Sequence, residues 1–379
     1  MRIWFIRTLR EFISHISMKY FNALNKIDGL GRKGLKMLAN HFENSQQIWQ
    51  ASHALLVAAG VRKDVADKVV AARPLIDPEI EWEKVQQENI VVATINDPEY
   101  PSLLKQIPDN PYLIYMKGDL SCLDLPMVAM VGSRKLTEYG NQVARGFAKE
   151  LAASGICVVS GLAFGIDAMS HRGALEGGGK TIAVLGNSLD SVSIAPRSNF
   201  QLSEEILKAG GLLISEFPIR TNADKWTFPA RNRLMAGMSS GTLVVEAAEK
   251  SGSLITANLA LDYNREVFAV PGSIFSPQSV ATHQLIKSGA KLVTCVKDVL
   301  EELKFDQPSF ASQPKQKTPN FELSKSEQEI YDCLTHESLH IDRIGKLTKL
   351  DTATISSILA ILEIKGAVKN IGGQNYIRL

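Results

Sequence analysis

Two arginines that flank an asparagine are the side chains of this sequence best suited to hold an anion. They belong to the segment Phe228-Pro229-Ala230-Arg231-Asn232-Arg233, which contains no acidic residue and precedes an apolar run from Leu243 to Ala248. Arginine keeps its charge and presents a planar fork of donors that matches phosphate oxygens. On this motif alone, a ligand site and a buried ion pair with the protein's own carboxylates are about equally well supported.

Apolar runs alternate with amphipathic segments over the middle of the chain. Strands that are apolar throughout and separated by helices are typical of a parallel sheet covered on both faces. The sequence therefore predicts an α/β fold, an extended Rossmann-like, doubly wound and mostly parallel sheet. The expected strands are Val128–Val131, Ile156–Ser160, Thr181–Leu185, Leu212–Ser215, Leu243–Ala247, Val267–Val270 and Lys291–Thr294, with helices such as Gln142–Ala153 and Ser253–Leu261 between them.

The segments that follow the expected strands carry groups that can bind phosphate. Ligands of an open parallel sheet bind beyond the carboxyl ends of its strands. Residues 132–134 (Gly-Ser-Arg) follow the first strand, residues 161–167 the second, and residues 251–256 come shortly after the fifth. Each loop alone is explained by a turn or a helix cap. Together with Arg231 and Arg233 at the same edge, they favour a polyanionic ligand held by amides, hydroxyls and charges.

The sequence offers little for catalysis or for a cofactor. Gly132 is not followed by the spacing of a dinucleotide fingerprint, and there is no Walker A lysine motif. His171 has no second titratable group at catalytic spacing, so we expect it to be structural, and we expect Glu246 to be architectural. The cysteines are scattered without a CxxC pair, which predicts a reducing compartment without disulfides or structural zinc. We therefore expect no enzymatic activity, no cofactor and no metal. The four cysteines are Cys122, Cys157, Cys295 and Cys333.

Composition and local patterns divide the 379 residues into six segments. Net charge of +2 means that any affinity for nucleic acid must come from local placement of charge. The N-terminal arginines interrupt any membrane span, and Met18 is a candidate start. The expected segments are a leader (1–21), a small all-α domain of helix-hairpin-helix or SAM-like type (22–75), a bridging segment (76–124), the Rossmann-like domain (125–304), a polar linker (305–324) and a winged-helix-like domain of three helices and a hairpin (325–379).

The ordered motifs of this sequence resemble those of the DNA processing protein family DprA, also called Smf. The resemblance covers the whole sheet region and includes Asp97-Pro98-x-Tyr100-Pro101 before it. The motifs that carry it are Gly132-Ser133-Arg134, Gly161-Leu-Ala-x-Gly165-Ile166-Asp167, Ser215-Glu216-Phe217-Pro218, Phe228-Pro-x-Arg231-Asn232-Arg233, Val245-Glu246-Ala247 with Ser251-Gly-Ser-Leu-Ile-Thr256, and Val270-Pro271-Gly272.

The resemblance implies a cytoplasmic, non-enzymatic protein that binds single-stranded DNA, forms a homodimer and helps to load the recombinase RecA during natural transformation. Phe164 is a candidate for base stacking. We expect Arg231 or Arg233 to face DNA and the other to hold Glu246 or Asp167. Arg197 is expected to supply a charge that family members carry after the third strand. The predicted DNA-binding residues are Gly132, Ser133, Arg134, Gly161, Gly165, Asp167, Arg197, Arg231, Asn232, Arg233, Ser251, Gly252, Ser253 and Thr256.

Two other functions remain open from the sequence. Gly241-Thr242 with Glu246 is superficially similar to the loop of nucleotide-processing enzymes of the phosphoribohydrolase type, but the spacing is one residue too long and the Pro-Gly-Gly is absent. A transcription regulator would act through the winged helix. The balanced charge of residues 325–379 argues against groove reading and makes protein contact as credible there as DNA contact.

Overall fold

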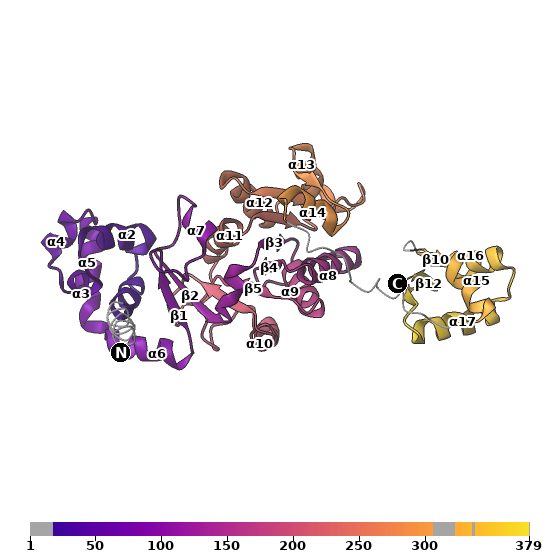
Figure 1. The fold of residues 1–379 in the computed structure, drawn as a ribbon, viewed down its shortest axis with the longest axis horizontal. Helices are drawn as coiled ribbons and strands as arrows, with labels where there is room; N and C mark the ends of the chain where they lie inside the picture. Colours follow the sequence, from indigo (N-terminus) through magenta and orange to yellow (C-terminus); the bar gives the residue numbers. More distant parts are fainter. Residues whose placement is uncertain (1–17, 306–322, 336–337, 379) are drawn as a thin grey trace, which may run out of the picture. The chain divides into compact units, whose positions relative to one another are not determined.

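A computed structural model describes residues 18–305, 323–335 and 338–378. The chain forms two compact units, residues 1–307 and 308–379, and each has its own hydrophobic core (Figure 1). The arginines of the predicted leader and nearly all of the predicted linker lie outside the described residues.

The larger unit is built around a nine-stranded sheet in its described part. The strand order is β1-β2-β6-β5-β4-β3-β7-β8-β9, and all neighbours from β6 to β9 are parallel. The predicted doubly wound, mostly parallel α/β fold is confirmed. The strands are β1 (Val91–Thr94), β2 (Leu113–Gly118), β3 (Met127–Val131), β4 (Cys157–Ser160), β5 (Thr181–Val184), β6 (Leu212–Ser215), β7 (Gly241–Val244), β8 (Glu266–Ala269) and β9 (Lys291–Leu292).

The bridging segment contributes two strands that sequence reasoning missed. β1 pairs antiparallel with β2, and β2 pairs antiparallel with β6, so they extend the edge of the sheet. Their separation by a turn and a short helix conceals the hairpin in the sequence. Two predicted strands also differ in extent. β7 ends at Val244 rather than Ala247, and β9 is only two residues long.

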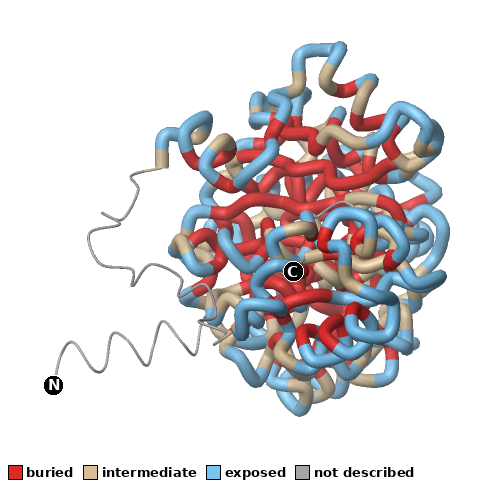
Figure 2. The backbone as a smooth tube through the Cα atoms, turned by 90° about the vertical axis from the view of Figure 1, so that its right-hand side faces the viewer, coloured by how far each residue is buried: buried red, intermediate tan, exposed pale blue. Residues whose placement is uncertain are grey.

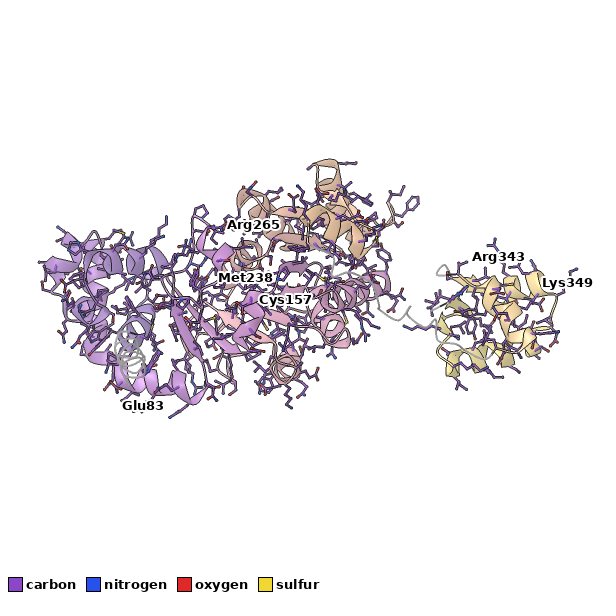
Figure 3. The ribbon with its side chains drawn as sticks, in the orientation of Figure 1. Glu83, Cys157, Met238, Arg265, Arg343 and Lys349 are labelled. Carbon is purple, nitrogen blue, oxygen red and sulfur yellow. The ribbon has the colours of Figure 1, made fainter. Side chains whose placement is uncertain are left out.

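Helices cover both faces of the sheet. Alternate residues of β3 enter different cores. Ala129 belongs to the same apolar cluster as Leu202, Leu234 and Ala257, whereas Val128 belongs to a second cluster with Phe147 and Val296. Cys157 and Met238, labelled in Figure 3, are fully buried. Figure 2 shows buried backbone segments in the interior and exposed segments around them. The helices are α7 (Ser102–Lys105), η2 (Leu120–Asp124), α8 (Glu138–Ala153), α9 (Ile166–Glu176), η3 (Arg197–Asn199), α10 (Phe200–Lys208), α11 (Thr227–Met238), α12 (Ser253–Asp262), η4 (Pro277–Ser279), α13 (Val280–Lys287) and α14 (Val296–Leu303).

The N-terminal region is all-helical and shares its core with one face of the sheet. Buried Leu24, Leu35 and Leu38 belong to the same apolar cluster as Tyr115 of β2. A glycine turn precedes α2, where Gly29 has a φ of 89°. The helices are residues 18–25, α2 (Gly31–His41), α3 (Ser45–Gln50), α4 (His53–Ala58), α5 (Lys63–Ala72), η1 (Arg73–Leu75) and α6 (Pro78–Gln87).

The smaller unit is a winged helix, as predicted. Asp351 caps the third helix by accepting a hydrogen bond from the Thr354 amide, because the first amides of a helix lack partners within it. Its elements are α15 (Lys325–Cys333), β10 (Leu339–His340), α16 (Ile341–Thr348), α17 (Thr352–Ile364), β11 (Val368–Gly372) and β12 (Asn375–Arg378). Within the described parts of both units, every helix is too short or too polar to cross a membrane.

Candidate functional site

The sheet changes direction between β3 and β7, and this is where the candidate site lies. From β3 the chain proceeds through β4, β5 and β6 on one side, and β7 to β9 follow on the other. The loops after β3 and β7 therefore separate and leave a crevice at the carboxyl ends of the strands.

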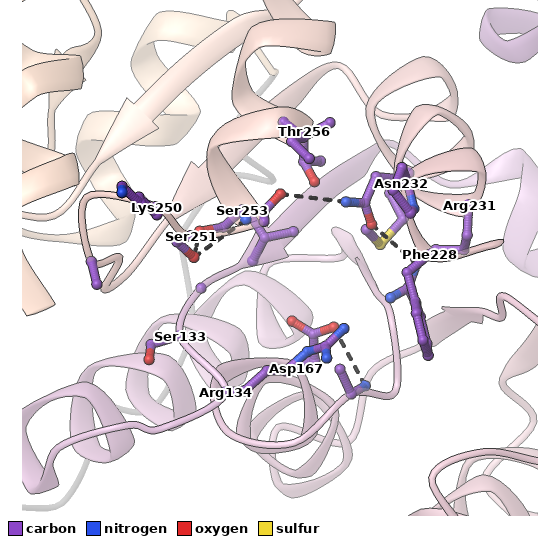
Figure 4. A pocket seen from close by; sticks show the side chains of 18 of the residues that line it. Ser133, Arg134, Asp167, Phe228, Arg231, Asn232, Lys250, Ser251, Ser253 and Thr256 are labelled. Carbon is purple, nitrogen blue, oxygen red and sulfur yellow. Dashed lines mark hydrogen bonds between the residues drawn. The ribbon is translucent and has the colours of Figure 1, made fainter. Parts of the chain in front are cut away.

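A pocket of about 600 Å³ occupies this crevice (Figure 4). Its walls come from the loop after β3, the start of α11 and the segment from Ala248 to Thr256. Four exposed cations stand at the pocket, whereas Asp167 is the acidic residue among those that line it. The excess of positive charge suits an anionic ligand. The four cations are Arg134, Lys135, Lys225 and Lys250.

Arg134 is the exposed guanidinium of the pocket. Its central carbon lies 4.9 Å from the centre of the Phe228 ring, at cation–π distance. The ring orients the planar fork without using its donors, so these donors remain available for phosphate oxygens.

Two glycines allow the Arg134 loop to lie against the start of α9. Gly165 has a φ of 75°, and a Cβ there would come within 2.2 Å of the Ser133 carbonyl oxygen. A Cβ on Gly132 would come within 2.6 Å of Ile166. Gly132 and Gly165, two of the predicted DNA-binding residues, thus permit close packing of this loop.

Arg231 lies beneath the pocket and is 3% exposed. It donates hydrogen bonds to the carbonyl oxygens of Gly161 and Val184, at the ends of β4 and β5. Asp167 is buried near it; burial raises the pKa of this carboxyl, and the attraction of Arg231 opposes the shift. The Arg231 charge thus contributes to the field of the pocket while its NH1 donor is occupied by the protein.

The opposite wall is lined by hydroxyls. Asn232 donates to the Gly252 carbonyl oxygen at 3.4 Å and ties α11 to the loop before α12. The hydroxyls of Ser251 and Ser253 lie 2.7 Å apart. The Thr256 hydroxyl is buried and has no hydrogen-bond partner among the described residues. An unsatisfied buried hydroxyl is costly, so a ligand that reaches it gains a hydrogen bond.

Arg233 does not line this pocket. Its side chain is 4% exposed, pairs with the Glu216 carboxylate and donates to the Asp109 carbonyl oxygen at 2.8 Å. The partner that sequence reasoning expected for such an internal arginine was Glu246 or Asp167. Glu246 instead accepts hydrogen bonds from the amide and hydroxyl of Thr137, the cap of α8.

Three further predicted residues also lie away from the lining. Arg197 donates to the Ser191 carbonyl oxygen at 2.7 Å and stacks over Phe200. Gly161 contributes its carbonyl oxygen to Arg231, and Gly165 shapes the loop packing. The structure brings ten predicted residues together at the pocket, namely Gly132, Ser133, Arg134, Asp167, Arg231, Asn232, Ser251, Gly252, Ser253 and Thr256.

Sequence reasoning missed three lysines of the pocket. Lys135, Lys225 and Lys250 each lie close to one of the predicted site motifs, yet none belongs to a recognisable pattern. Proximity to the glycine and arginine motifs was the available signal. Phe228 belongs to the arginine segment but was not among the predicted site residues.

His171 is a buried core residue. Its Nδ1 lies 2.8 Å from the Thr181 hydroxyl, which itself donates to the Val158 carbonyl oxygen. Nδ1 therefore carries the proton in this pair. Burial lowers the pKa of His171 to about 3, so the ring is neutral at physiological pH. Within the described residues, no cluster of three metal-ligating side chains occurs.

Comparison with known proteins identifies two regions of the chain. Residues 91–304 match the family "DNA recombination-mediator protein A", and residues 314–374 match the "DprA winged helix domain". Protein Smf of Synechocystis sp. is 35% identical over 95% of this chain and 98% of its own length. DNA processing protein DprA of Bacillus subtilis is 39% identical over 67% of this chain and 88% of its own.

Solved structures give the same result. The X-ray structure of DNA processing protein A from Streptococcus pneumoniae has a TM-score of 0.66 and 36% identity, and the match covers 76% of this chain and 99% of that one. A structure from Helicobacter pylori that concerns the single-stranded DNA binding mode of its DNA processing protein A has a TM-score of 0.51 and 32% identity, over 56% of this chain and 95% of that one. The sheet, its edge pocket and these matches together show that the chain belongs to the DprA/Smf family of DNA processing proteins.

Proposed function

We propose that this protein binds single-stranded DNA in the pocket at the edge of the sheet and acts in the cytoplasm as a recombination mediator. The observation that carries the proposal is the pocket itself, which is lined by four exposed cations, by the Phe228 ring and by Thr256, whose hydroxyl has no hydrogen-bond partner among the described residues. Phosphates of a DNA strand would meet the cations, and a base would reach the ring. The relative from Helicobacter pylori, whose structure concerns single-stranded DNA binding, supports this ligand.

The dimensions of the pocket favour a single strand over a duplex. A pocket of about 600 Å³ has the volume of a site for a small ligand, so it admits a few atoms of backbone and base at a time. Base faces and edges are accessible in a single strand and hidden in a duplex. We therefore expect recognition that tolerates any sequence.

Mobility shifts with matched single-stranded and duplex DNA test the proposal. The intact protein should bind the single strand more tightly. Arg134→Ala should weaken this binding at least about tenfold, since a hydrogen bond from a charged group contributes about 1.5 to 3 kcal/mol. It should also reduce the slope of log affinity against log salt by about 0.7 for each phosphate that the variant no longer neutralises.

Arg172→Ala is the matched control, because Arg172 is an exposed arginine of α9 that does not line the pocket. This variant should bind like the wild type. Equal affinity of the wild type for single and double strands would count against the proposed function, and an unchanged Arg134→Ala would remove Arg134 from the site.

RecA loading and dimer formation are the finer parts of the proposal, and family membership supports them. RecA assembly on a protein-coated single strand tests the first part. We expect the wild type to accelerate this assembly and Arg134→Ala to accelerate it less or not at all. For the homodimer contact we propose the segment after β8, where Ile274 and Phe275 are 78% and 90% exposed. Large apolar side chains exposed to this extent are typical of surfaces that a partner covers.

A further inference from the structure

A second pocket lies between the glycine turn before α2 and the start of α11. It has a volume of about 250 Å³ and is lined by residues that include Gly29, Arg32, Glu216, Phe217 and Trp226. The site described above shares none of these residues. The first turn of α11 separates the two pockets, since Lys225 and Phe228 line the first while Trp226 and Ala230 line the second.

Hydrogen bonds hold the walls of the second pocket together. Asn25 donates to the Tyr115 hydroxyl and to the Glu216 carbonyl oxygen, both at 3.2 Å. Lys26 donates to the Ile219 carbonyl oxygen at 3.2 Å. The helical region and the sheet thus present one preformed cavity, which lowers the entropic cost of binding.

Trp226 is an aromatic surface at the mouth of this pocket. It is 61% exposed, although large aromatic side chains normally bury most of their area. Its ring meets Phe217 edge to face, with centroids 5.5 Å apart and an interplanar angle of 78°. This contact fixes the orientation of the indole and leaves much of its surface to solvent.

Glu216 places an unsatisfied acceptor at the same pocket. One carboxylate oxygen pairs with Arg233, whereas Oε1 is buried without a hydrogen-bond partner among the described residues. Burial also raises the pKa of this carboxyl, against the attraction of Arg233. Every nucleobase carries at least one N–H donor on its Watson–Crick edge, and in thymine and uracil this donor is the single imide N–H. The face of any base can stack on an aromatic ring.

We propose that the second pocket binds a nucleobase of the DNA strand that occupies the first pocket. The base stacks on Trp226 and donates an edge N–H to Oε1 of Glu216, while the backbone crosses the first turn of α11 beside Lys225. This inference rests on the proposed function and adds to it a path for the strand from the sheet edge to the N-terminal helices.

Oligonucleotides of graded length, from about 4 to about 16 nucleotides, test the path, since single-strand-binding modules span sites of this size. Trp226→Ala should bind the shortest strands like the wild type and the longest ones about fivefold or more weakly. Trp226→Phe, which keeps an aromatic face, should restore most of the loss. Leu75→Ala, at an exposed apolar residue that lines neither pocket, is the matched control and should bind like the wild type.

Strands with abasic sites separate base binding from phosphate binding. On a fully abasic strand, Trp226→Ala and the wild type should bind equally, because the stacking partner is missing from both. The inference would be overturned if Trp226→Ala and the wild type bound normal strands of every length with equal affinity. It would also be overturned if Trp226→Ala lost the same factor of affinity at every length. Either result leaves the proposed function standing, whereas a wild type that binds no single strand refutes the proposed function itself.

Discussion

Arg231 and Arg233 show how two positions along a helix determine the role of a charge. Residues two apart on an α-helix point about 200° away from each other, so one arginine faces the sheet edge and the other faces the N-terminal side. Arg231 donates from NH1 to backbone carbonyl groups, and Arg233 pairs with Glu216 and donates to the Asp109 carbonyl oxygen. The exposed guanidinium of the pocket is therefore Arg134, which a sequence motif of only three residues supplies.

His171 makes stability depend on pH. The unfolded chain binds a proton at this histidine below about pH 6.5, whereas the folded pKa is about 3. Between these values the unfolded state holds more protons, so the free energy of unfolding falls as pH decreases, by up to about 1.4 kcal/mol per pH unit. His171→Asn, which retains an N–H donor for Thr181, should lose this contribution.

Urea unfolding at pH 7 and pH 5 measures this effect. The wild type should lose more free energy of unfolding than His171→Asn between the two values. Parallel losses in both proteins would contradict the assignment of His171 as a buried neutral ring.

At the scale of elements, the junction of the β3 loop with α9 shapes the pocket. Gly165→Ala places a Cβ within 2.2 Å of the Ser133 carbonyl oxygen at a φ of 75°. We expect the free energy of unfolding to fall by at least about 1 to 3 kcal/mol, because a steric clash adds to the backbone strain. The displaced loop carries Arg134, so affinity for single-stranded DNA should fall as well.

Gly155→Ala is the matched control for this substitution. Gly155 has a similar φ of 81°, but a Cβ there meets nothing within 4 Å. Gly155→Ala should lower the free energy of unfolding by about 1 kcal/mol, from backbone strain alone, and leave DNA affinity unchanged. An equal loss of affinity in both variants would show that general destabilisation, not loop position, controls binding.

At the scale of the whole molecule, the exposed apolar segment at Ile274 and Phe275 bears on the proposed homodimer. Phe275→Asp replaces the most exposed aromatic ring of the described residues with a carboxylate. Burying an unpaired charge in an interface is costly, so this substitution should weaken a dimer contact made there. If the proposed homodimer forms through this segment, light scattering should report a dimer for the wild type and a monomer for Phe275→Asp. Leu75→Asp, at an exposed apolar residue elsewhere on the same unit, should leave the dimer intact. A dimeric Phe275→Asp would move the interface to another surface.

The fold was largely predictable because its signals are local. Apolar runs and helical periodicity identified β3 to β6 and β8 closely, as well as the three helices of the winged helix. β1 and β2 were missed because they belong to the sheet only through pairing with β6, a contact between residues about 100 positions apart. Such long-range pairing leaves little trace in the pattern of either segment.

The sequence by itself determined the fold class and the glycine, hydroxyl and arginine motifs of the candidate site, since residue type and spacing carry them. Only the tertiary structure decided which groups reach the pocket. It turned Arg233 toward Glu216, paired NH1 of Arg231 with backbone carbonyl groups, and brought Lys135, Lys225 and Lys250 to the same pocket as Arg134. The physical reason is that exposure and partnership of a charged side chain depend on neighbours that are distant in the chain.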